Sequence, residues 1–362
     1  MTKRERYLKA LRNEQVDKLV WAPNFDYWLH VNRAEETVPE KFRGMSRNDI
    51  VRAIGGYIWN RAGGYNVVLD DSVKETYTDD GVNIIREYHT PIGSIREVHR
   101  QTEGAQRSKH LSEHFVKDLD SLRIMKYVVE ATHYEPAYEP TFKALEETGD
   151  DGVVLNMALC IPFIQFAKMD VGYINGFFMW MDYREEVDSL LNLYFEKFLQ
   201  AFTVMADGPA DIIATGDNMD GVMISPEIFK EYAIPFYQEV KKVTSARGKI
   251  FQGHWCGRTQ NLLPITPGSG LDVVEAIVSK PMADIELTEA IDMLKGEVVL
   301  QGGIPAVLVC HEGGSFDDFT RYIEEVILPL KGRKGFILGM SDNVPPNADF
   351  ARIEAIASLI GA

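Results

Sequence analysis

The sequence predicts a single α/β domain folded as a (β/α)8 barrel. Eight short apolar runs, each closed by polar residues or glycine, alternate with longer segments of helical periodicity. Such nearly continuous apolar runs are typical of parallel strands that helices cover on both faces. A length of 362 residues is sufficient for one barrel with insertions. We therefore expect one barrel domain over residues 1–362.

The predicted strands occupy residues 19–23, 65–70, 153–159, 210–216, 249–253, 271–277, 298–302 and 335–339. The start of a helix can be recognised at two places between them. Ser225, Pro226 and Glu227 combine an N-cap, a first-turn proline and a carboxylate that favours the helix N-terminus. Ser315 and Asp318 have the spacing of an acidic capping box. Both patterns predict helices that return the chain to the next strand.

Two regions interrupt this alternation of strands and helices. Residues 72–115 contain the turn signal Thr90-Pro91-Ile92-Gly93 between segments of alternating polarity, which predicts a β-hairpin inserted after the second strand. Residues 26–60 are expected to form N-terminal helices over the mouth of the barrel. Neither region indicates a second domain.

Composition and charge exclude several classes of partner. The net charge of −16 argues against binding to nucleic acid or to an anionic lipid surface. Three cysteines cannot build a disulfide framework and indicate a reducing compartment. The charged start of the chain leads into an amphipathic helix, and no apolar run approaches the roughly 18 residues needed to span a membrane. We therefore expect a cytoplasmic protein; a homodimer is left open.

Polar side chains follow the predicted strands, at the end of a barrel where function is usually located. Carboxylates that converge in a low-dielectric cavity repel one another unless a cation lies among them. The set therefore favours a metal site, although Asp220 and Asp342 would equally suit helix capping. Its members are Asn24, Asp26, His30, Asp70, Asp71, Asn156, Asp217, Asn218, Asp220, His254, Cys256, Glu275, Gln301 and Asp342.

The most specific pattern is His254-Trp255-Cys256, which follows the run 249–253. Residues i and i+2 of a strand point the same way, so the imidazole and the thiolate are placed to share one zinc ion with an open coordination position. The alternative is a buried cysteine beside a hydrogen-bonded histidine. Asp217 is the preferred third ligand, or else a general acid or base beside the metal. Cys310 is expected to be a small apolar residue in a helix interface.

Several segments together resemble the uroporphyrinogen decarboxylase-like superfamily, and the likeness covers nearly the whole chain. The segments are residues 4–11, 90–93, 224–229, 254–257 and 301–304, and Pro345-Pro346. The resemblance implies a (β/α)8 barrel. It also implies either decarboxylation of uroporphyrinogen or zinc-dependent methyl transfer with a corrinoid protein.

The residues that differ decide between these activities. Decarboxylases in this superfamily carry an arginine-rich segment after the first strand, but residues 24–28 contain no cation. They also carry a histidine at the end of the last strand, where this chain has Met340. Members that methylate a thiol have a cysteine at that same position, and a thioether is a poor zinc ligand. The resemblance therefore favours a member that removes a methyl group from an oxygen or nitrogen substrate.

The resulting hypothesis is a methyltransferase that moves a methyl group from a small methylated compound, such as an aryl methyl ether, to the Co(I) of a corrinoid protein. Zinc on His254, Cys256 and Asp217 would polarise the ether oxygen. Asp217, Asp26 and Asn156 are the predicted catalytic residues, and the corrinoid belongs to the partner protein. The predicted substrate-binding residues are Tyr27, Trp28, Phe163, Gln301 and Met340. A decarboxylase, a zinc hydrolase or lyase, and a ligand-binding relative without catalysis are the alternatives.

Overall fold

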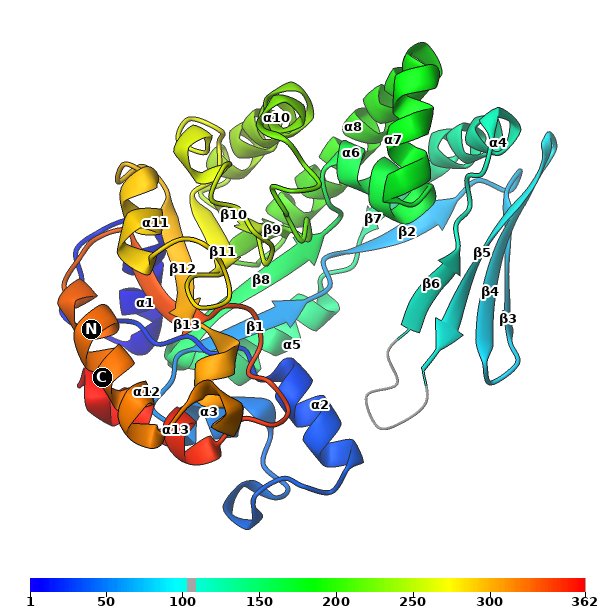
Figure 1. The fold of residues 1–362 in the computed structure, drawn as a ribbon. Helices are drawn as coiled ribbons and strands as arrows, with labels where there is room; N and C mark the ends of the chain where they lie inside the picture. The colour runs from blue at the N-terminus through cyan, green and yellow to red at the C-terminus, as the bar shows by residue number, and fades with distance from the viewer. Residues whose placement is uncertain (103–108, 362) are drawn as a thin grey trace. The chain divides into compact units, whose positions relative to one another are not determined.

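The computed structural model describes residues 1–102 and 109–361 and has an α/β fold (Figure 1). The chain forms two compact units. The first unit comprises Met1–Gly64, Tyr138–Ala158 and Ala206–Ala362. The second unit comprises Tyr65–Ala137 and Leu159–Met205.

A curled sheet of seven parallel strands forms the centre of the first unit (Figure 1). Residues 20–22 lie between its two edges: Leu338 N donates to Val20 O at 2.9 Å, and Tyr57 N donates to Trp21 O at 2.7 Å. This arrangement is that of a TIM-barrel-like fold. In spatial order the strands are β1 (Ile58–Ala62), β8 (Gly152–Ala158), β9 (Ile212–Thr215), β10 (Ile250–His254), β11 (Val273–Ile277), β12 (Val299–Ile304) and β13 (Phe336–Met340).

Two predicted strands of this sheet are wrong. The run 19–23 forms no strand, and only its Trp21 pairs, in an isolated parallel bridge with Leu338. The run 65–70 forms β2 (Tyr65–Leu69), which pairs antiparallel with β7 (Thr132–Pro136) in the second unit. Its place beside β8 is taken by β1, whose Ile58 and Trp59 are buried whereas Arg61 is exposed. The prediction failed because polar residues interrupt the apolar character of β1, and β2 has the more apolar sequence. Asp70 and Asp71 therefore do not follow a strand of the parallel sheet, and Arg61 does.

Alternate strand residues and the first helix fill the interior of the sheet. Val153 and Leu155 of β8 are fully buried there, as is Val273 of β11. Helix α1 (Lys3–Leu11) begins with a capping box between Thr2 and Glu5 and contributes Tyr7 to the same core. The remaining core residues are Ala10, Leu11, Val20, Ala22, Tyr57, Trp59, Ile212, Ala214, Ile250, Val299 and Ile337. Because residues i and i+2 share a face, the next residues along these strands also point inward.

Helices connect the strands of the first unit. The N-terminal helices expected over residues 26–60 are α2 (Asp26–Ala34) and α3 (Arg47–Ala53). Both predicted helix starts are confirmed, since the Ser225 side chain accepts a bond from Ile228 N and Ser315 forms a capping box with Asp318. The other helices of this unit are α5 (Glu139–Thr148), α9 (Pro226–Ile228), α10 (Ile234–Ser245), α11 (Leu287–Met293), α12 (Phe316–Tyr322) and α13 (Phe350–Ile360).

The second unit holds an antiparallel sheet of four strands in the region where one hairpin was expected. Thr90 pairs with Gly93, so Pro91 and Ile92 connect the second and third of these strands. The strands are β3 (Lys74–Asp79), β4 (Asn83–Thr90), β5 (Gly93–Gln101) and β6 (Lys109–Glu113). The helices of this unit are α4 (Leu119–Glu130), α6 (Pro162–Ile164), α7 (Tyr173–Asp182) and α8 (Arg184–Asp207), of which α8 runs on to the boundary with the first unit. Within residues 1–102 and 109–361, none of the helices combines the length and the apolar character that crossing a membrane requires.

Asp170 is a buried acid in the second unit, at the end of a π-helical turn (Gln165–Asp170). Tyr194 OH donates to its Oδ2 at 2.7 Å, and Gln165 Nε2 donates to its Oδ1 at 2.8 Å. Burial raises the pKa of Asp170 to about 7, although both hydrogen bonds act in the opposite direction. The carboxyl group therefore holds its proton in the folded chain at pH values where the unfolded chain has lost it.

Because the pKa of Asp170 is raised, we predict that this residue contributes less to the free energy of unfolding as the pH rises. The raised pKa gives a stabilising contribution that is complete below pH about 4 and is lost as the pH rises towards 7. Asp170→Asn removes the titrating proton, so its free energy of unfolding relative to the wild type should rise by a few kcal/mol, in order of magnitude, between those limits. Denaturant unfolding at a series of pH values measures this. Asp182→Asn, at an exposed position of the same unit, is the control; parallel curves for wild type and Asp170→Asn would contradict the prediction.

Candidate metal centre

His254 ends strand β10, and its imidazole is held from one side by a carboxylate. Its Nδ1–H donates to Glu275 Oε2 at 2.6 Å, and both side chains are buried. The two residues are register partners in neighbouring strands β10 and β11. Because Nδ1 is engaged by Glu275, Nε2 is the nitrogen available for a metal ion.

The backbone after Glu275 is shaped to aim this carboxylate. The register of β11 against β12 shifts between Glu275 and Ile277, and Ala276 has a φ of 69°. This is the left-handed region, which costs an alanine about 1–2 kcal/mol. Bulges of this kind redirect a side chain at a sheet end. We interpret the strained Ala276 as part of what holds Glu275 against His254.

Cys256 lies two residues beyond His254, in the loop after β10. Its Sγ–H donates to Asn218 Oδ1 at 3.3 Å. Asn218 is itself in the left-handed region, with a φ of 46°. Backbone bonds from Met219 N to His254 O and from Gly257 N to Met219 O join the two loops at 3.3 and 3.0 Å. The loop after β9 therefore fixes the position of the thiol.

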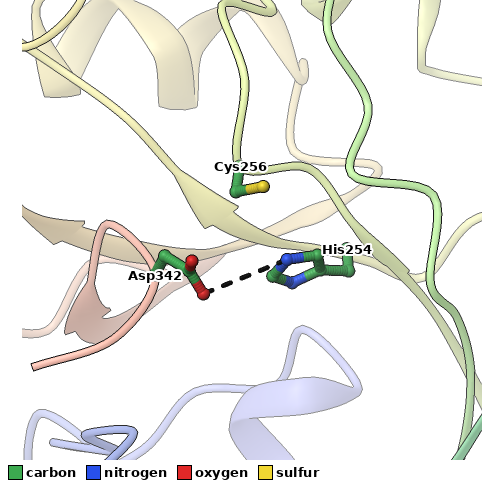
Figure 2. Close-up of side chains that lie close together, drawn as sticks. All are labelled: His254, Cys256 and Asp342. Atoms are coloured by element: carbon green, nitrogen blue, oxygen red, sulfur yellow. Dashed lines mark ion pairs between the residues drawn. The ribbon is translucent and has the colours of Figure 1, made fainter. Parts of the chain in front are cut away.

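Asp342, just beyond β13, completes a group of three possible metal ligands. One ligand atom from each of His254, Cys256 and Asp342 lies within 4.8 Å of the other two. The His254 Nε2 and Asp342 Oδ1 atoms are 4.0 Å apart. Figure 2 shows the Asp342 carboxylate directed at the His254 ring, with the Cys256 sulfur beside both. Within the described ranges, no other group of three such side chains meets this criterion.

The chemistry of the three donors fits zinc. Imidazole nitrogen, thiolate sulfur and carboxylate oxygen are the ligand types that this ion accepts, and three protein ligands leave the fourth position open. Soft sulfur together with borderline nitrogen disfavours magnesium and calcium, which prefer oxygen alone. The Glu275–His254 pair supplies the outer contact that oriented histidine ligands commonly make.

The charged groups of the site shift one another's pKa values. Burial lowers the pKa of His254, but the Glu275 carboxylate and the Cys256 side chain outweigh it and raise the pKa to about 11. Burial raises the pKa of Asp342, and Glu275 adds to this effect, whereas His254 and Arg61 oppose it. Without metal, the ring therefore carries a proton on Nε2 that a metal ion has to displace.

Asp217, the preferred third ligand from the sequence, is not a member of this group. It is fully buried, and its Oδ2 accepts from Thr215 Oγ1 at 2.5 Å and from Tyr237 OH at 2.6 Å. The acid directly precedes Asn218, which contacts the Cys256 thiol. This position indicates that Asp217 anchors the loop; its catalytic role stays a prediction.

The other two predicted catalytic residues make structural contacts. The Asp26 carboxylate forms an ion pair with Arg47 Nε at 2.7 Å. The Asn156 amide donates to Ala62 O and to Thr141 Oγ1, both at 2.9 Å, while its buried Oδ1 has no partner among the described residues. These contacts give both side chains fixed orientations.

The predicted substrate-binding residues lie in different surroundings. Tyr27 is exposed, whereas Trp28 is buried against Phe25 and Phe350. Phe163 belongs to the second unit and packs on Phe177 and Trp180. Gln301 Oε1 accepts from Tyr7 OH at 3.0 Å, and Met340 is buried at the end of β13. Their roles in substrate binding stay predictions.

Two further residues, Asp220 and Cys310, have local partners. Asp220 Oδ1 accepts from Val222 N at 2.7 Å and so closes a turn, whereas the next helix, α9, has Ser225 as its N-cap, so the helix-capping alternative is wrong for Asp220. Cys310 is buried and its Sγ contacts Ala306 O and Asn347 Oδ1, both at 3.5 Å. Cys310 is therefore absent from the metal group, as expected from the sequence.

The sequence placed Asp342 at the correct strand end but did not name it as a ligand. The available signal was its position two residues after Met340, directly beyond the last predicted strand. Arg61 was missed altogether, because the strand that carries it was assigned to residues 65–70. The available signal was the position of Arg61, two residues after Trp59 and therefore on the same face of the strand.

Comparison with known proteins identifies the family. Residues 110–361 match the uroporphyrinogen decarboxylase (URO-D) family, and the chain belongs to it. No curated protein sequence matches the chain. A methyltransferase from Methanosarcina mazei superposes with a TM-score of 0.60 at 13% identity, over 100% of this chain and 98% of that one. At this identity the likeness shows the fold alone, and it supports the TIM-barrel-like architecture.

Two other solved structures are more distant. A D-psicose 3-epimerase from Clostridium cellulolyticum H10 has a TM-score of 0.35 at 11% identity, over 62% of this chain and 82% of that one. A GH113 β-1,4-mannanase has a TM-score of 0.39 at 10% identity, over 96% of this chain and 99% of that one. Neither similarity is close enough to inform the function.

Removal of a proposed ligand should remove the metal. We expect the wild type, loaded with zinc and then desalted, to retain about one ion per chain, and Cys256→Ala and Asp342→Ala to retain much less. Elemental analysis of the desalted proteins measures this. Cys310→Ala, which also loses a thiol but lies outside the group, is the control. Equal zinc content in the wild type and Cys256→Ala would show that Cys256 is not a zinc ligand and would rule out the proposed site.

The contact between Glu275 and His254 should also affect metal affinity. Glu275→Gln keeps an oxygen acceptor for Nδ1–H but removes the charge, so zinc affinity should fall by about 10- to 100-fold. Competition with a chromophoric chelator measures the affinity. Glu297→Gln makes the same change at an exposed position before β12 and should have no effect. Unchanged affinity in Glu275→Gln would show that the pair does not support the metal.

Proposed function

We propose that this chain is a methyltransferase that moves a methyl group from a small methylated compound to the Co(I) of a separate corrinoid protein. The expected methyl donor is an oxygen or nitrogen compound, with aryl methyl ethers as the first class to test. The observation that carries the proposal is the convergence of His254, Cys256 and Asp342, with ligand atoms within 4.8 Å of one another. Membership in the URO-D family supports it, because that superfamily includes such enzymes.

His254, Cys256 and Asp342 would hold the metal ion. When bound, zinc supplies Lewis acidity that makes the oxygen of the ether a better leaving group. Glu275 fixes the imidazole through Nδ1 so that Nε2 faces the site, and Asn218 orients the Cys256 sulfur. The chain therefore provides two ligand atoms, on His254 and Cys256, whose directions are already set before a metal arrives.

The transfer itself is a displacement at carbon. The bond between the methyl carbon and the substrate oxygen breaks, and the oxygen keeps the electron pair and takes a proton from water. The new bond forms between the methyl carbon and cobalt, which is formally oxidised from Co(I) to Co(III). The cofactor belongs to the partner, so this chain has to bind the donor, exclude side reactions and present the methyl group.

Met340 favours a reaction that removes a methyl group from an oxygen or nitrogen compound over one that methylates a thiol. Met340 is buried, and its thioether is a poor zinc ligand. Asp342, two residues further along the same strand end, supplies a carboxylate to the group instead. A ligand group with one sulfur and one carboxylate differs from that of the thiol-methylating members, which have a cysteine at the position of Met340. The cytoplasmic location and a homodimer stay predictions.

Methyl transfer to a free corrinoid tests the proposal. With zinc-loaded protein, Co(I) cobalamin and a panel of methoxyarenes, we expect formation of methylcobalamin, followed by its absorbance spectrum. Cys256→Ala should lower the rate at least 100-fold, because it removes a ligand of the metal, whereas Cys310→Ala should not. The demethylated product should be released in the same molar amount as methylcobalamin is formed. An unchanged rate in Cys256→Ala would contradict the proposed role of the site.

A further inference from the structure

Arg61 stands at the carboxyl end of β1, on the inner side of the sheet. Trp59, two residues earlier, belongs to the core cluster, so Arg61 points to the same side one layer further out. Its guanidinium carbon lies 4.7 Å from the centre of the Trp59 ring. The side chain is exposed even though the tryptophan beneath it is buried. The indole therefore serves as a platform that holds the cation in place.

The Arg61 guanidinium has no carboxylate partner among the residues that the structure describes. Its neighbour Arg47 differs in this respect, because Arg47 forms an ion pair with Asp26 at 2.7 Å and donates to Asn60 Oδ1 at 2.7 Å. Arginine at a bidentate site presents a rigid fork of donors that matches a carboxylate. The stacked Arg61 leaves this fork unused.

Arg61 and the candidate metal group stand at the same end of the parallel sheet. Arg61 is the last residue but one of β1, His254 ends β10, and Asp342 follows the end of β13 by two residues. All of these residues, with Trp59 and Arg47, belong to the first unit. An anion bound at Arg61 would therefore lie at the same end of the sheet as the group formed by His254, Cys256 and Asp342.

We propose that Arg61 is a substrate-binding residue and that the methylated substrate carries a carboxylate, which the stacked guanidinium holds. This inference rests on the proposed function for its account of the methyl group, but the binding of the carboxylate can be measured separately. It names a class of substrate: a small methylated compound that also carries a carboxylate.

The surrounding charge favours a singly charged anion. Asp342, Glu275 and Asp26 belong to the first unit, as Arg61 does, and the whole chain has a net charge of −16. One exposed guanidinium balances one negative charge, whereas a phosphate dianion would add repulsion from these acids. A carboxylate also uses both donors of the fork in one plane. The arrangement therefore selects a carboxylate over a phosphate.

Binding of acid and amide pairs tests this assignment. The probes are the three methoxybenzoates and the matching methoxybenzamides, which have nearly the same shape and differ in charge. Equilibrium dialysis or calorimetry with the zinc-loaded protein measures their affinities. We expect at least one acid to bind the wild type about tenfold or more tightly than its amide, since bonds to charged groups are the stronger ones. Arg61→Gln should abolish this preference, and Arg61→Lys should restore only part of it.

Matched variants separate this inference from the proposed function. Arg12→Gln removes the same charge from an exposed arginine near the amino ends of β10 and β12 and should leave the preference intact. If acids and amides bind equally, if no acid binds, if inorganic phosphate displaces the acid as well as a second carboxylate does, or if Arg61→Gln keeps the preference, the inference is wrong. Methyl transfer from a methoxybenzoate that is as fast and as tightly bound with Arg61→Gln as with the wild type would overturn the inference and leave the proposed function standing. Arg61-dependent binding of an acid without any methyl transfer would do the reverse.

Discussion

The hydrogen bond between His254 and Glu275 is the interaction on which the rest of the site depends. It joins two neighbouring parallel strands in the interior of the sheet, at a point where the buried core changes from apolar to polar residues. A buried carboxylate and a buried imidazole are each costly alone, and each satisfies the other here. The bond also decides which nitrogen of the ring is available for a metal. The geometry of the three donors follows from that choice.

Backbone conformation at the strand ends completes the arrangement. Ala276 and Asn218 are both non-glycine residues with positive φ, and each lies directly beside a residue of the site. One shapes the bulge after Glu275, and the other carries the amide oxygen that accepts from Cys256. Strained residues persist where the surrounding structure determines them, and they concentrate at functional positions. Two of the non-glycine residues with positive φ therefore stand beside residues of the proposed site, while Asn13, Glu36 and Lys295 lie elsewhere.

Much of the fold could be predicted from the sequence because most of the parallel strands are continuous apolar runs. The strand β1 could not, since Asn60 and Arg61 break its apolar pattern while the run 65–70 has the stronger one. The pair His254 and Cys256 followed from strand periodicity, but the choice between Asp217 and Asp342 did not. That choice depends on which side chain is already engaged by neighbours such as Thr215 and Tyr237, and such contacts come from tertiary structure.

The central claim is that one metal ion binds to a nitrogen of His254, the sulfur of Cys256 and an oxygen of Asp342. X-ray absorption at the zinc edge of the loaded wild-type protein tests it most directly. The account predicts a single sulfur at about 2.3 Å and the remaining ligands as nitrogen or oxygen at about 2.0–2.2 Å. A shell with no sulfur, or one with two, would contradict it.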